Sequence, residues 1–135
     1  MTAITTRPLS DSTDSLLRFA LRADATLTGL AGLAIAAAAG PLSSVTRLTA
    51  AQEFAAGAAF VVYGLVVFTV AAAPKLRGIG IGVAIANVAY TVGCALVVLA
   101  GTPVMTHGAV LTLASGVYTA FFALLQYLGV RRLAA

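Results

Sequence analysis

Four long runs of apolar residues, separated by short polar connections, dominate this sequence. The runs cover residues 25–42, 54–73, 79–100 and 110–130, and none of them contains a charged side chain. A helix rises about 1.5 Å per residue, so a run of about 20 residues crosses the roughly 30 Å hydrocarbon core of a bilayer. The sequence therefore predicts an all-α membrane protein with four transmembrane helices.

The scarcity of charge supports the same class of protein. Only 9% of the residues are charged and 61% are hydrophobic, whereas soluble domains carry about 25% charged residues. So few charges cannot cover a water-facing surface, but a surface that faces lipid does not need them. The net charge of +4 comes from basic residues at the ends of the runs and not from a basic face. No nucleic-acid partner is therefore expected.

The basic residues also predict the orientation. Those on one side of the predicted bundle are Arg18, Arg22, Lys75, Arg77, Arg131 and Arg132, and only Arg47 lies on the other side. Because cytoplasmic loops carry the excess of Lys and Arg, both termini are expected in the cytoplasm. The absence of Trp and the abundance of Ala, Gly and Val are associated with GC-rich bacterial genomes. We therefore expect an antiparallel four-helix bundle in a bacterial plasma membrane.

The N-terminal residues are of a different kind. Residues 1–15 are polar and aperiodic and predict a disordered cytoplasmic tail, followed by a single membrane domain over 16–132. Residues 16–23 alternate apolar side chains with Arg18 and Arg22, which favours a short helix lying at the membrane interface. A cleavable signal peptide is the alternative interpretation of this region, but Asp24 at the start of its apolar stretch is unusual for one.

The connections between the runs contain helix start and stop signals. Thr49 and Gln52 have the spacing of a capping box, so the second transmembrane helix is predicted to start at or just after Thr49. The loop PKLRG, with Pro74 as a stop and Gly78 as a restart, is short enough to make the second and third helices antiparallel neighbours.

Residues for catalysis or metal binding are nearly absent. The chain has one cysteine, Cys94, and one histidine, His107, whereas a zinc site takes several His, Cys or carboxylate ligands and a bis-histidine haem takes two. There is no glycine-rich phosphate loop and no Ser-His-Asp set. We therefore expect no metal, no cofactor and no enzymatic activity.

Asp24 immediately precedes the first predicted transmembrane run. As an intramembrane carboxylate, it would be a candidate proton or cation site. The favoured interpretation places it at the cytoplasmic end of the first run, where the helix dipole stabilises an anion and Arg22 lies nearby.

A stripe of polar side chains runs along the third and fourth runs, with a tyrosine of the second run at a similar depth. Its candidate members, for lining a ligand site or for interhelical hydrogen bonds, are Tyr63, Asn87, Tyr90, Thr91, Tyr118, Thr119 and Gln126. Tyrosines normally lie at the membrane interfaces, but Tyr63, Tyr90 and Tyr118 fall roughly halfway across. Their hydroxyls therefore need partners inside the bundle. The sequence leaves open whether these groups only join helices or line a cavity.

Small residues recur at every fourth position of the first run. Thr28, Gly32, Ala36 and Gly40 form a ridge that allows another helix to approach closely. The spacing does not tell whether the ridge packs inside one chain or between copies.

Three segments carry a resemblance to a known family: LRADATLTGLAG (21–32), AGPL (39–42) and FFALLQYLGVRR (121–132). They resemble a family of small four-span integral membrane proteins of actinobacteria and proteobacteria that mostly lack an assigned function. The resemblance implies the four-span topology and no catalytic residues.

Two functions are compatible with these features. The first is a non-catalytic protein that acts through self-assembly or as an accessory subunit of a membrane complex, as the ridge and the short loops suggest. The second is a transporter or binder of a small lipophilic molecule that uses the polar stripe. An internal cavity lined by Asn87, Tyr90 and Tyr118 would favour the second.

Overall fold

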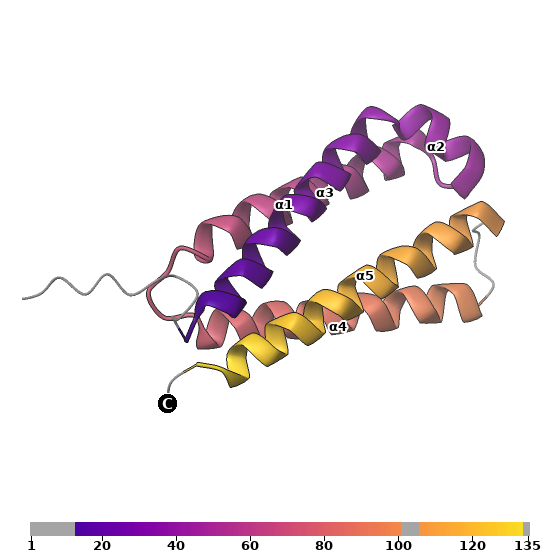
Figure 1. Ribbon diagram of the computed structural model, residues 1–135. Helices are drawn as coiled ribbons and strands as arrows, with labels where there is room; N and C mark the ends of the chain where they lie inside the picture. The colour runs from indigo at the N-terminus through magenta and orange to yellow at the C-terminus, as the bar shows by residue number, and fades with distance from the viewer. Residues whose placement is uncertain (1–12, 101–105, 134–135) are drawn as a thin grey trace, which may run out of the picture.

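The computed structural model describes residues 13–100 and 106–133, and in these residues the regular structure is α-helical. Its helices are α1 (Ser15–Ala37), α2 (Ala39–Thr46), α3 (Ala50–Val70), α4 (Arg77–Leu99) and α5 (Thr106–Arg131) (Figure 1). All except the short α2 are long and apolar enough to cross a membrane. The protein is thus a multi-pass membrane protein with four candidate transmembrane helices, as the sequence predicts.

The four long helices form two antiparallel pairs. α1 packs along α3 and α4 packs along α5, while α1 joins the two pairs mainly through α5. The pairs lie close together at the end that holds the C-terminus and spread apart toward α2 (Figure 1). We call these the terminal end and the α2 end. The predicted antiparallel four-helix bundle is confirmed.

The N-terminal part of the bundle differs from the prediction. The interfacial helix expected over 16–23 and the transmembrane run expected over 25–42 belong largely to one continuous helix, α1. No Gly or Pro interrupts the chain around Asp24, so nothing breaks the helix there. α1 ends at Ala37 because the ring of Pro41 would clash with the carbonyl of that residue. Pro41 instead lies in the first turn of α2, where a proline is tolerated.

The other boundaries lie close to the predicted ones. The runs expected over 54–73, 79–100 and 110–130 correspond to α3, α4 and α5. The capping box is confirmed: the Gln52 amide N–H donates to Thr49 Oγ1 at 3.1 Å, and the Thr49 N–H donates to Gln52 Oε1 at 2.9 Å. Of the tail predicted over 1–15, residues 1–12 lie outside the described residues.

α1 and α3 meet backbone to backbone. A Cβ atom built on Gly32 would lie 2.5 Å from the carbonyl oxygen of Gly57, and one built on Gly57 would lie 2.6 Å from the backbone nitrogen of Ala36. Gly32 and Ala36 of the expected ridge therefore pack inside the chain. Gly40 does not, since nothing lies within 4 Å of its Cβ position, and the side chain of Thr28 bonds to Asp24 instead.

The terminal end of the bundle is closed by apolar side chains. Leu17 and Leu21 are fully buried there, in a cluster with Ala25, Val67, Ala71, Leu76 and Val130. Leu17 fits against α5 because residue 129 is glycine: a Cβ at that position would lie 2.7 Å from the Leu17 Cα. We call this cluster the terminal plug.

Candidate functional site

Asp24 lies inside the bundle, near the middle of α1, and is only 1% exposed. The expected position at a helix end beside Arg22 is therefore wrong. The guanidinium of Arg22 lies over the ring of Phe68, 5.8 Å from its centroid. Arg18 pairs with Asp14 at 2.7 Å and donates to the backbone carbonyl of Ala71. No basic side chain among the described residues forms an ion pair with Asp24.

Five side chains hydrogen-bond to the Asp24 carboxylate. Oδ2 accepts from Tyr63 Oη at 2.8 Å. It also accepts from Asn87 Nδ2 and Gln126 Nε2, each at 2.9 Å. Oδ1 lies 3.1 Å from both Thr28 Oγ1 and Tyr118 Oη. All four transmembrane helices thus contribute to the site, which we call the Asp24 network.

The partners of Asp24 also hydrogen-bond to one another. Asn87 Nδ2 also donates to Gln126 Oε1 at 2.9 Å, and the hydroxyls of Thr28 and Tyr118 lie 3.0 Å apart. Among the described residues, no buried side-chain nitrogen or oxygen lacks a hydrogen-bond partner. The hydrogen-bonding capacity of the Asp24 carboxyl group is therefore met by neighbouring side chains.

The predicted polar stripe divides into two groups. Tyr63, Asn87, Tyr118 and Gln126 meet at Asp24.

The remaining members join α4 to α5. The Thr91 and Thr119 hydroxyls lie 2.6 Å apart, Thr91 donates to the Gly116 carbonyl at 3.0 Å, and the Tyr90 hydroxyl lies 3.2 Å from Ser115 Oγ. The sequence pattern did not place Asp24 in the stripe, whereas the structure puts it at the centre of the hydrogen bonds. Thr28, one turn after Asp24 on the same helix face, was the available signal.

A cavity of about 390 Å³ lies on the α2 side of the Asp24 network and is partly open to the surface, where Leu27 and Tyr90 are 50% and 37% exposed. All four transmembrane helices contribute to its wall, which consists of Leu27, Thr28, Ala31, Ile35, Phe60, Tyr63, Ala86, Asn87, Tyr90, Ser115, Tyr118 and Thr119. Four of these residues (Thr28, Tyr63, Asn87 and Tyr118) also hydrogen-bond to Asp24. They form a polar floor between the carboxylate and an otherwise largely apolar and aromatic chamber. We call it the central cavity.

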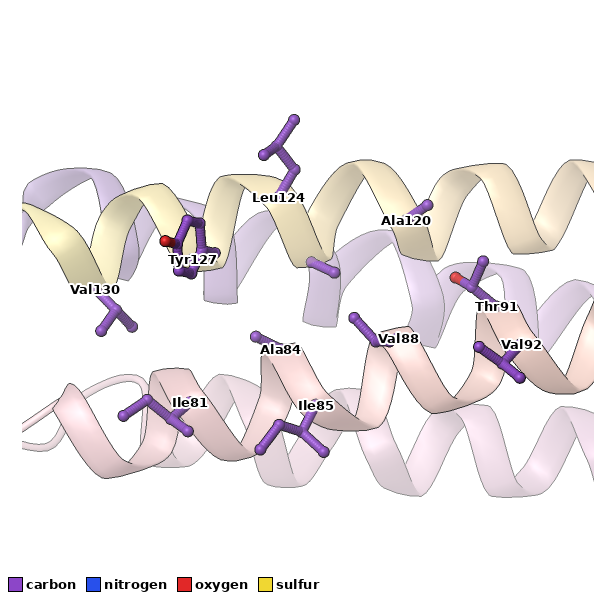
Figure 2. Close-up of a pocket in the computed structure, with 11 residues that line it drawn as sticks. Ile81, Ala84, Ile85, Val88, Thr91, Val92, Ala120, Leu124, Tyr127 and Val130 are labelled. Atoms are coloured by element: carbon purple, nitrogen blue, oxygen red, sulfur yellow. The ribbon is translucent and has the colours of Figure 1, made fainter.

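A larger hollow of about 730 Å³ lies between α4 and α5 (Figure 2). Its wall is almost wholly aliphatic, and side chains such as Ile85 and Val88 are 63% and 52% exposed. The Thr91 hydroxyl is committed to partners on α4 and α5. This groove offers apolar surface of the kind that lipid tails cover, without convergent polar groups. The central cavity, although smaller, is the better candidate for specific recognition.

Within residues 13–100 and 106–133, no group of three or more His, Cys, Asp or Glu residues comes together in a way that would hold a metal ion. Cys94 is buried, with its sulfur 3.7 Å from Ser115 Oγ. Neither a family model, nor a curated protein, nor a solved structure matches this chain, so no family is identified.

Proposed function

We propose that this protein binds a small lipophilic molecule in the central cavity and carries it across the membrane. The observation that carries the proposal is the combination of an apolar chamber and a polar floor in the middle of the bundle. Its volume of about 390 Å³ falls in the range of about 300–1,000 Å³ that is typical of small-molecule sites. Asn87, Tyr90 and Tyr118, whose presence around a cavity would favour binding over assembly, all line it.

The chemistry of the floor supports the same function. Ionisable side chains within transmembrane segments are rare and commonly mark substrate or ion pathways. Asp24 is such a residue, and its hydrogen-bond partners come from four different helices. A ligand that displaces one partner would therefore act on all four helices at once. No catalytic step is part of this proposal.

For the orientation, we propose that the terminal end faces the cytoplasm of a bacterium, because the basic residues gather at that end. The central cavity then lies in the outer half of the bilayer, with the terminal plug between it and the cytoplasm. Transport, as distinct from binding, requires Leu17 and Leu21 to move out of the plug.

Assembly is the weaker proposal. Two of the four small residues that suggested an oligomer seam, Gly32 and Ala36, instead contact Gly57 of α3 within the chain. No other feature of the described residues favours a subunit interface over a surface that faces lipid.

The test is to fill the cavity. Ala86 and Ala89 are both exposed positions of α4, but only Ala86 lies in the wall of the cavity. Ala86→Phe should therefore narrow the cavity, and Ala89→Phe is the matched control. Each variant is purified from native membranes, and the bound small molecules are identified by mass spectrometry. We expect a molecule that accompanies the wild-type and Ala89→Phe proteins but not Ala86→Phe. If both variants carry the same molecules as the wild type, or none carries any, the central cavity is not a binding site.

A further inference from the structure

We infer that the ligand of the central cavity is an organic cation: an ammonium group on an apolar body. This inference rests on the proposed function and names its ligand class. Two independent features of the cavity carry it, namely the aromatic rings in its wall and the charge behind its floor.

The first feature is the aromatic lining. Phe60, Tyr63, Tyr90 and Tyr118 contribute four rings to one cavity of about 390 Å³. Phe60 and Tyr90 stand edge to face, with ring centroids 6.0 Å apart. The face of an aromatic ring attracts a cation, most strongly where water is excluded, and cages of such rings recognise quaternary ammonium groups.

The second feature is the sign of the nearest charge. The wall of the cavity contains no Lys, Arg, Asp or Glu, and Asp24 lies directly behind Tyr63, Asn87 and Tyr118. The donors around its carboxylate are neutral groups, so they solvate the charge without cancelling it. In a low-dielectric interior, the cavity therefore favours a positive ligand and disfavours an anion.

The two features select the same molecule. Leu27, Ala31 and Ile35 favour an apolar body, the rings favour a weakly hydrated cation, and Asp24 provides the counter-charge. A neutral molecule of the same shape would gain only the contact with the apolar wall. The charge on the ligand, and not its shape, should therefore decide its affinity.

The experiment compares two molecules of nearly the same shape, phenyltrimethylammonium and tert-butylbenzene. The chain has four tyrosines and no tryptophan, so in a Tyr127→Phe background its fluorescence comes only from Tyr63, Tyr90 and Tyr118 in the cavity wall. Each probe is titrated into this protein in vesicles of zwitterionic lipid, which add no fluorescent protein. We expect the cation to bind about tenfold more tightly than the neutral probe, or better.

Two variants test the two features. Asp24→Asn should abolish the preference for the cation. Phe60→Leu should weaken cation binding by about threefold to tenfold and leave the neutral probe unchanged. The matched control is Phe54→Leu on the same helix, because Phe54 is 58% exposed and lies outside the wall. Asp24→Asn places an amide against two amide donors, so its folding is checked by thermal unfolding. If Asp24→Asn does not fold, the inference is tested by the affinities of the two probes for the Tyr127→Phe protein and by the effect of Phe60→Leu on them.

The outcomes separate the two proposals. Equal binding of the two probes overturns the inference of a cation and leaves the proposed binding function standing. Binding of neither probe overturns both. A cation preference that survives Asp24→Asn would show that the Asp24 charge does not select the ligand. A preference that is unaffected by Phe60→Leu would show the same for the aromatic ring. Either result overturns the inference.

Discussion

The carboxylate of Asp24 brings together five polar side chains from all four transmembrane helices. A charged residue at the centre of a transmembrane helix costs at least about 2.5–3.5 kcal/mol on insertion scales. Hydrogen bonds to charged groups stabilise by about 1.5–3 kcal/mol each, and Asp24 has five side-chain partners. The network is therefore large enough to hold the carboxylate in the membrane, and each partner is in turn satisfied by Asp24.

Asn87→Leu should lower the free energy of unfolding by about 1–3 kcal/mol, because it takes a donor from the Asp24 carboxylate and from Gln126 Oε1 at once. The matched control is Val88→Leu, at a neighbouring position that is 52% exposed and should be unchanged. Reversible unfolding in detergent measures both. An Asn87→Leu protein as stable as the control would show that Asn87 contributes nothing to holding the carboxylate.

At the scale of the helices, α1 and α3 pack closely because glycines at their contact have no side chains to keep the two backbones apart. The sequence predicts a small-residue ridge from positions 28, 32, 36 and 40, and the structure places Gly32 and Ala36 on the contact. The true contact also includes Ala25 and Gly29, both close to Gly64 of α3. It therefore follows steps of three and four along the helix rather than four alone. Sequence spacing located the face of α1 but not its partner helix.

Gly32→Ala should destabilise the bundle by about 1–3 kcal/mol, because even one methyl group would lie 2.5 Å from the Gly57 carbonyl and force the helices apart. Gly93→Ala is the matched control. Nothing lies within 4 Å of its Cβ position, so the higher helix propensity of alanine should leave α4 equally or more stable. Thermal unfolding of the two variants in detergent compares them. Similar unfolding temperatures would mean that α1 and α3 are not in backbone contact.

The extent of α1 shows where sequence reasoning fails. The four helices, their antiparallel order and the capping box follow from local features, namely the apolar runs, the loop lengths and the spacing of Thr49 and Gln52. The position of Asp24 does not, because an isolated carboxylate is least costly at a membrane interface. Its partners Tyr63 and Gln126 lie 39 and 102 residues away along the chain, so only the folded bundle shows that the carboxylate is satisfied in the interior.

The whole molecule is asymmetric along the direction of its helices. Toward the terminal end, Asp24 is shut off by the buried Leu17 and Leu21, while toward α2 it borders the central cavity. The central cavity thus lies in the α2 half of the bundle, and the hydrogen-bond partners of Asp24 separate it from the buried carboxylate. The basic residues gather at the opposite, terminal end, so we propose that this half faces the outside of the cell.

Cysteine labelling tests the proposed orientation. In a Cys94→Ser background, a cysteine replacing Ser44 of α2 should react with an impermeant thiol reagent added outside intact cells, and one replacing Gly78 of α4 should react only after permeabilisation. Both positions are exposed, and Gly78 has open space at its Cβ position, so both should tolerate the change. The reverse pattern would put the central cavity on the cytoplasmic side. Labelling of both in intact cells would overturn the even number of crossings, because Ser44 and Gly78 lie at opposite ends of α3.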